Sequence, residues 1–124
     1  MSDLAKKPKA HYAPVYAAAL YPEFAEIARA HGYALAVHGS LARDFDLVAI
    51  PWTETAAEPI TVVEAITTSF AAKLVGGPPS LKPHGRLAYT LSIGFGECAV
   101  DLSFMPRCIA LVDRGTTPDP EPIL

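Results

Sequence analysis

The sequence predicts an α+β domain, with a mixed or antiparallel sheet of about four strands and helices packed on one face. Three observations lead to this prediction. Two segments carry apolar residues at helical spacing, four short segments have the apolar content of strands, two of them with clear alternation at period two, and glycine or proline separates most of them. At 124 residues, the chain has room for one hydrophobic core but not for two.

The first helix is expected between Pro14 and Ala30, where apolar residues recur at nearly helical period. Gly32 follows at a position where helices commonly stop. Pro22 lies inside the segment and is expected to break or kink the helix, because proline lacks the N–H that a helix interior requires.

Two short strands are expected next, YALAVH over residues 33–38 and FDLVAIPW over residues 45–52. The connection GSLAR is short enough for a hairpin loop. Pro51 either ends the second strand or places it near an edge of the sheet, because proline cannot donate a ladder hydrogen bond.

A second helix is expected from Pro59, a residue favoured in a first helical turn, with apolar side chains at spacings of three or four as far as Leu74. Gly76 and Gly77 would end it, and residues 76–85 (GGPPSLKPHG) read as an exposed loop. RLAYTLSI (86–93) and ECAVDLSFM (97–105) alternate at period two around Gly94-Phe95-Gly96, which predicts a second hairpin.

The ends of the chain differ from this core in composition. Residues 1–10 are expected to be a flexible N-terminus, residues 11–108 the single domain, and residues 109–124 a proline-rich tail, with IALVDR after Arg107 adding at most one short element. Cys98 and Cys108 lack the context of a zinc site and are interpreted as free thiols.

Bulk properties narrow the class of protein. The net charge of −3 provides no extended nucleic-acid surface, so contact with a polyanion would have to be local. The sequence contains no signal peptide and no apolar run long enough to cross a membrane, so a cytoplasmic protein without membrane contact is expected.

Acidic residues share one face of the predicted strands. Side chains two residues apart in a strand point the same way, so each strand has one apolar face and one face with polar positions. If the strands form one sheet, the polar side gathers His38, Asp44, Asp46, Arg86, Asp101 and Ser103. The order of the strands is not fixed by this periodicity.

Three converging carboxylates repel one another at neutral pH unless a cation or a raised pKa compensates them. Magnesium suits Asp44, Asp46 and Asp101 because it prefers oxygen ligands and retains positions for water or phosphate. One or two such ions would support phosphoryl or nucleotidyl transfer. The alternative is structural: Asp44 and Asp46 would be a solvated pair at a hairpin entrance, tied to Arg43 or Arg86.

Gly39-Ser40 followed by Asp44-Phe45-Asp46-Leu47, with Asp101-Leu102 on a later strand, resembles the nucleotidyltransferase superfamily, typified by DNA polymerase beta and the minimal nucleotidyltransferases. The resemblance implies that Gly39 and Ser40 approach a triphosphate. It also implies that Asp44 and Asp46 hold magnesium, and that Asp101 completes the metal site and helps to activate an acceptor hydroxyl.

The sequence departs from that family in one place. The family has a longer segment with a helical turn between Gly-Ser and the first Asp, whereas only Leu41, Ala42 and Arg43 intervene here. The phosphate cradle is therefore shortened, and Arg43 is a candidate to supply charge in its place. Longer stretches, including IGFGECAVDLSFMPR, also resemble small uncharacterised phage and prophage proteins, which implies a phage setting.

Other polar and aromatic residues have two interpretations each. Lys82, His84 and Arg86 are candidates to contact phosphate or are solvated loop residues, and His38 is interpreted as a hydrogen-bonded strand end. Trp52 and Tyr89 are interpreted as packing residues, with stacking on a base as the alternative.

The sequence thus leads to the expectation of a magnesium-dependent nucleotidyltransferase that binds a nucleoside triphosphate and transfers a nucleotidyl group to an unknown acceptor hydroxyl. The alternative is a catalytically degenerate form of that fold, acting as a phage-encoded binding or inhibitory protein. A metal-dependent nuclease is a third option, against which the low basic content argues.

Overall fold

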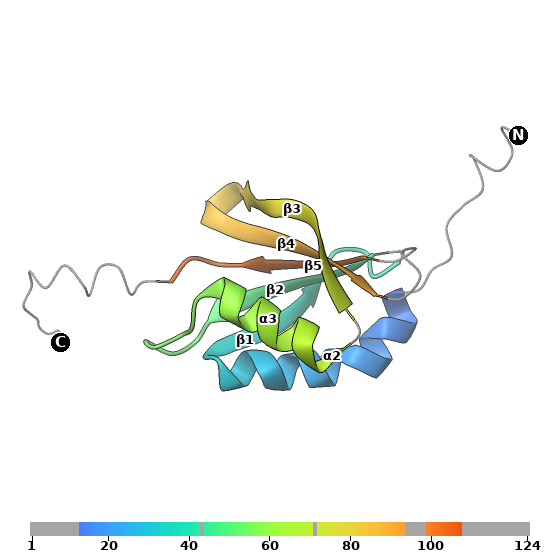
Figure 1. The fold of residues 1–124 in the computed structure, drawn as a ribbon, viewed down its shortest axis with the longest axis horizontal. Helices are drawn as coiled ribbons and strands as arrows, with labels where there is room; N and C mark the ends of the chain where they lie inside the picture. The colour runs from blue at the N-terminus through green and yellow to red at the C-terminus, as the bar shows by residue number, and fades with distance from the viewer. Residues whose placement is uncertain (1–12, 43, 71, 94–98, 108–124) are drawn as a thin grey trace, which may run out of the picture.

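The computed structural model describes residues 13–42, 44–70, 72–93 and 99–107. The described elements follow the order α2, β1, β2, α3, β3, β4, β5, with a short 3-10 turn before β4. Both helices lie on the same side of the sheet (Figure 1). The segments expected at residues 1–10 and 109–124, the turn at 94–96, and Cys98 and Cys108 lie outside the described residues.

The first helix, α2, spans Ala13–Ala30 and contains Pro22. Of the two outcomes predicted for Pro22, a break or a kink, the break is not found, because the helix is continuous through Pro22; its axis bends along its length (Figure 1). Pro22 faces solvent, where water can satisfy the backbone carbonyl that loses its partner. Phe24 and Ala28 are fully buried and face the sheet.

Strands β1 (Tyr33–His38) and β2 (Phe45–Pro51) form the predicted antiparallel hairpin, with Tyr33 opposite Pro51 and His38 opposite Asp46. Its loop is held to the first turn of α2, because the Ala13 N–H donates to the Ala42 carbonyl at 3.1 Å. The hairpin therefore fixes Asp46 at the start of β2, beside the end of β1.

The second helix, α3, spans Pro59–Ser69, so its predicted extension to Leu74 is wrong. Phe70 is already extended, with φ −130°, and its N–H closes the helix on the Ile66 carbonyl. The Phe70 ring then packs edge-on against Phe24 at 5.2 Å. The apolar spacing was misleading because Leu74 belongs to the following strand, where it lies opposite Leu91.

That strand, β3 (Ala72–Lys82), runs through most of the segment that was predicted as a loop. It pairs antiparallel with β4 (Arg86–Ile93), and the register shifts between Val75 and Ser80, across Gly76, Gly77 and two prolines. The turn Pro83–Gly85 joins the two strands. The sheet thus has five described strands rather than about four.

The strand order is β1-β2-β5-β4-β3, and β5 spans Ala99–Phe104. β2 and β5 pair in parallel, whereas the other three described pairings are antiparallel, so the sheet is mixed. The sheet face under the helices, here called the covered face, supplies most of the buried core. Its members include Phe45, Leu47, Ala49, Tyr89, Leu91, Val100, Leu102 and Phe104. No helix in the described part of the chain is long and apolar enough to span a membrane.

Candidate functional site

Two of the predicted acids become direct neighbours at the centre of the sheet. The parallel pairing of β2 with β5 places Asp46 opposite Asp101, both on the face away from the helices, here called the open face. Asp101 also accepts a hydrogen bond from the Thr90 hydroxyl of β4 at 3.4 Å. Two carboxylates from different strands therefore converge without any residue between them.

Burial and the neighbouring Asp101 both affect the pKa of the Asp46 carboxyl. Burial raises the pKa of the Asp46 carboxyl above its usual value, a hydrogen bond to Asp101 raises it further, and the negative charge of Asp101 adds to both. Such a hydrogen bond forms only when one of the two carboxyl groups is protonated. His38 opposes these effects, and Asp44 adds a smaller repulsion. The pair accordingly favours a proton or a cation between its oxygens.

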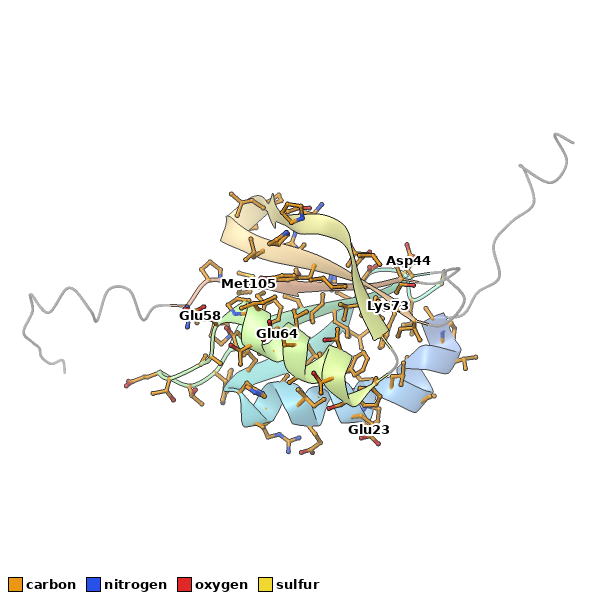
Figure 2. All side chains as sticks on the ribbon, in the orientation of Figure 1. Glu23, Asp44, Glu58, Glu64, Lys73 and Met105 are labelled. Carbon is orange, nitrogen blue, oxygen red and sulfur yellow. The ribbon has the colours of Figure 1, made fainter. Side chains whose placement is uncertain are left out.

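Asp44 lies one residue before β2 and is exposed. Figure 2 shows it on the opposite side of the sheet from Glu23, which projects from α2. Within residues 13–42, 44–70, 72–93 and 99–107, no group of three or more His, Cys, Asp or Glu side chains is gathered for a metal ion. The structure thus brings Asp46 and Asp101 together but does not assemble the expected set of three with Asp44.

Gly39 lies against the Asp46 carboxylate. Its φ of +79° is a backbone conformation that favours glycine, and a Cβ at this position would collide with Oδ2 of Asp46. The glycine therefore leaves room for the carboxylate, a local role that the sequence did not reveal. Ser40 follows in the exposed part of the loop, and Arg43 lies outside the described residues.

Basic side chains of β3 and β4 line the same cavity as this carboxylate pair. Arg86, half-buried at the start of β4, donates from Nη1 to the Ser103 hydroxyl at 3.2 Å and from Nε to the Pro83 carbonyl at 3.3 Å. Ser103 is only 4% exposed, although it belongs to the open face. These two acceptors are neutral, so they orient the guanidinium without neutralising its charge.

A polar cavity of about 270 Å³ is lined by both the paired carboxylates and the basic side chains. It is lined by His38, Asp46, Ser80, Lys82, Arg86, Ala88, Thr90, Asp101 and Ser103. Ser80 was missed in the sequence because its segment was predicted as a loop. Lys82 lies opposite Arg86 across the β3–β4 pair, which gives this residue of the predicted loop a defined place in the cavity.

The donors of this cavity fit a magnesium ion that carries phosphate. Magnesium commonly binds through one or two carboxylates and takes its remaining ligands from water and substrate phosphates. Asp46 and Asp101 supply the two carboxylates, and burial together with the neighbouring Asp101 raises the pKa of Asp46. Lys82 and Arg86 are suited to phosphate oxygens that extend beyond the ion.

The remaining candidates divide between the core and the surface. Tyr89 is buried and packs edge-on against Phe104 at 5.8 Å, as its interpretation as a packing residue predicted. Trp52 is 78% exposed, so the same interpretation is wrong for it. His84 lies in the exposed turn before β4, with φ +68°, and is not among the cavity residues.

Comparisons with family models, with curated proteins and with solved structures found no match to this chain. The resemblance to nucleotidyltransferases therefore stays a prediction from Gly39-Ser40, Asp44, Asp46 and Asp101 in the sequence.

Proposed function

We propose that this protein is a magnesium-dependent, nucleotidyltransferase-like protein that binds a nucleoside triphosphate on the open face of its sheet. The observation that carries the proposal is the in-register pair of Asp46 and Asp101 in a cavity that also contains Lys82 and Arg86. Paired acids beside fixed cations suit a metal–phosphate ligand better than either charge type would alone.

In the proposed reaction, an acceptor hydroxyl oxygen forms a bond to the alpha phosphorus, and the bond from that phosphorus to pyrophosphate breaks. Magnesium, when bound, would neutralise charge on the phosphate oxygens. Asp46 and Asp101 would hold the ion, and Asp101 would also help to accept the hydroxyl proton. Arg86, oriented by Ser103, would stabilise the departing pyrophosphate.

Calorimetric titration of magnesium with each nucleoside triphosphate tests the binding. Wild type is expected to bind, and Asp46→Asn and Asp101→Asn are each expected to weaken binding by at least about tenfold, because each variant loses a charged ligand. Asp44→Asn should have a smaller effect, because Asp44 is exposed and outside the pair. Glu23→Gln is the matched control, because it removes an acid on the other side of the sheet.

Absence of magnesium-dependent binding by wild type would refute the proposal. Equal binding by wild type and both paired-acid variants would place the nucleotide elsewhere on the protein. Arg86→Met is expected to weaken nucleotide binding, while magnesium alone still binds. Arg29→Gln, which removes an exposed arginine on α2, controls for the loss of positive charge.

A second candidate is a catalytically degenerate protein that binds its ligand without turnover. Two observations favour it: the third ligand is not assembled, and only residues 39–44 separate β1 from β2. Release of pyrophosphate separates the two candidates. Magnesium-dependent release that disappears in Asp101→Asn supports the enzyme, whereas binding without release for any acceptor tried supports the degenerate form.

A further inference from the structure

The open face differs in chemistry on the two sides of the paired acids. The strand order β1-β2-β5-β4-β3 places Asp46 of β2 and Asp101 of β5 in the middle of the sheet. On the β4 side lie Arg86 and Lys82, opposite each other in the β3–β4 pair. On the β1 side, His38 lies opposite Asp46, and the surface beyond this pair is apolar. The acids therefore separate a basic surface from an apolar one.

The apolar surface is formed by β1 and the second half of β2. Ala36 lies opposite Val48, Ala34 lies opposite Ile50, and Trp52 follows β2 at the same alternation. Ala34 and Trp52 are exposed, and Ile50 is 37% exposed. We call these five residues the Trp52 patch. Apolar side chains on a sheet face that no described helix covers are typical of a contact surface.

The patch is long, and it ends at a second cavity. A strand rises about 3.4 Å per residue, so the patch extends from about 7 Å to about 20 Å from Asp46 along β2. At its far end, Trp52 borders a cavity of about 380 Å³ between β1 and α2, where the helix contributes Tyr21, Ala25 and Arg29. A molecule that reaches from the acids to this cavity needs the length of an extended peptide of about six residues.

The charges around the patch narrow the class of that molecule. Among the described residues that form the patch or line this second cavity, Arg29 alone carries a charge, and its Nη1 lies 2.9 Å from Oε2 of Glu26. A polynucleotide laid along the patch would therefore place its phosphates over apolar side chains, without the lysine or arginine that neutralises them. A peptide has a neutral backbone and can present apolar side chains to such a surface. The patch thus favours a protein.

The geometry of nucleotidyl transfer fixes the side from which an acceptor must approach. The attacking oxygen and the departing pyrophosphate lie roughly in line, on opposite sides of the alpha phosphorus. Under the proposed function, the pyrophosphate extends toward Lys82 and Arg86 on the β4 side. The acceptor therefore approaches Asp46 and Asp101 from the β1 side, where the Trp52 patch lies.

We propose that the acceptor is a serine, threonine or tyrosine hydroxyl of another protein, in a segment that lies extended along the Trp52 patch and places an apolar side chain in the second cavity. This inference rests on the proposed function and adds the class of acceptor. The side-chain oxygen forms a bond to the alpha phosphorus, the bond to pyrophosphate breaks, and the hydroxyl proton passes to Asp101. The product is a phosphodiester that joins the side chain to the nucleoside.

The test offers wild type two kinds of acceptor, with magnesium and nucleoside triphosphates labelled at the alpha phosphate. One is a library of peptides of about ten residues, long enough to span the patch, each with a single hydroxyl side chain. The other is a mixture of single-stranded DNA and RNA oligonucleotides. Label is expected on peptides, most strongly where an apolar residue lies about six positions from the hydroxyl. Label on oligonucleotides alone would overturn the inference, although the proposed function would survive.

Two variants test the patch with a peptide selected in this way. Trp52→Ala removes an apolar contact and Ala34→Gln places an amide on the apolar surface, so each is expected to raise the KM for the peptide by about tenfold. The affinity for nucleoside triphosphate, measured by calorimetry, should be unchanged, which also shows that each variant is folded. Val15→Ala is the matched control, because it trims an exposed apolar residue of α2 outside the patch.

The remaining outcomes bear on one proposal or on both. If both patch variants label the peptide like wild type, the acceptor binds elsewhere and the inference is wrong. Nucleotide binding without transfer to any peptide also overturns it, while the binding part of the proposed function stands. If wild type binds no nucleotide, both proposals fail. If Trp52→Ala converts a dimer into a monomer in sedimentation, the patch is a contact between copies and the acceptor assignment is wrong.

Discussion

The two faces of the sheet are built from the same strands, yet they differ in nearly every property. On β5, Val100, Leu102 and Phe104 are buried under the helices, whereas Asp101 and Ser103 face a polar cavity. The covered face gains stability from apolar burial, while the open face holds paired acids at some cost to stability. The alternation of side chains along each strand thus produces both the covered face and the open face. Substitutions can test the two faces separately.

The largest effect is expected on the covered face. Phe104 is 1% exposed and makes edge-on contacts with Tyr33 at 5.3 Å and with Tyr89. Phe104→Ala should lower the free energy of unfolding by about 3 to 5 kcal/mol, because it leaves a cavity in the core. Urea denaturation measures this loss, and Asp101→Asn on the same strand is the open-face reference. A loss below about 1 kcal/mol for Phe104→Ala would contradict the division between the faces.

The second-largest effect on stability is expected at Gly32. Gly32 has φ +92°, and a Cβ there would lie 2.5 Å from Thr53 Oγ1 and 2.7 Å from the Ala56 Cα. Gly32→Ala should lower the free energy of unfolding by about 2 to 3 kcal/mol, because strain and collision combine. Gly77→Ala is the control, since Gly77 also has positive φ but nothing within 4 Å. Equal losses in the two variants would mean that the collision contributes nothing.

Gly39→Ala tests a glycine with positive φ inside the candidate site, again with Gly77→Ala as the control. Its backbone strain should cost about 1 kcal/mol or more, and its Cβ must displace the Asp46 carboxylate. We therefore expect magnesium affinity to fall in this variant but not in Gly77→Ala, as measured by calorimetry. Unchanged affinity would show that the position of Asp46 does not depend on Gly39.

The smallest expected effect has the opposite sign. Because the folded-state pKa of Asp46 is raised, its contribution to stability is present below the unfolded pKa and is lost as pH rises through the folded pKa. Asp46→Asn removes the repulsion, so it should stabilise the protein above about pH 4 by about 0.2 to 1 kcal/mol, a range that allows for solvent screening.

Thermal unfolding across pH measures this gain. Saturating magnesium should reverse the order of wild type and Asp46→Asn, because only wild type retains both carboxylates to bind the ion. Asp44→Asn is the control and should change stability less. A lower melting temperature for Asp46→Asn at neutral pH without metal would show that the pair is not under electrostatic strain.

The local parts of the fold were predictable from the sequence. β4 and β5 alternate apolar and polar residues, whereas β1 and β2 are mostly apolar; the period of two along β2 and β5 also indicated that Asp46 and Asp101 share a face. Their direct adjacency was not predictable, because it depends on β5 pairing in parallel with β2, a contact between distant segments. The strand order carries that information, and periodicity does not encode it.

The error at β3 has a different physical cause. Leu74, Val75 and Leu81 are all exposed, so this edge strand lacks the regular alternation of buried apolar and exposed polar residues that a sequence pattern could reveal. Glycine and proline at residues 76–79 also carry the composition of a loop. Strand formation here depends on pairing with β4 and overrides local preference. The same error concealed Ser80 and part of the cavity wall.

The irregularity in β3 has a consequence for the solubility of the protein. An edge strand ordinarily offers free N–H and C=O groups to any other strand, and that invites aggregation. Pro78 and Pro79 have no N–H to offer, the register is broken between Val75 and Ser80, and charged Lys73 and Lys82 lie near the two ends. The features that made this segment read as a loop therefore leave a sheet edge on which a neighbouring molecule finds no continuous template.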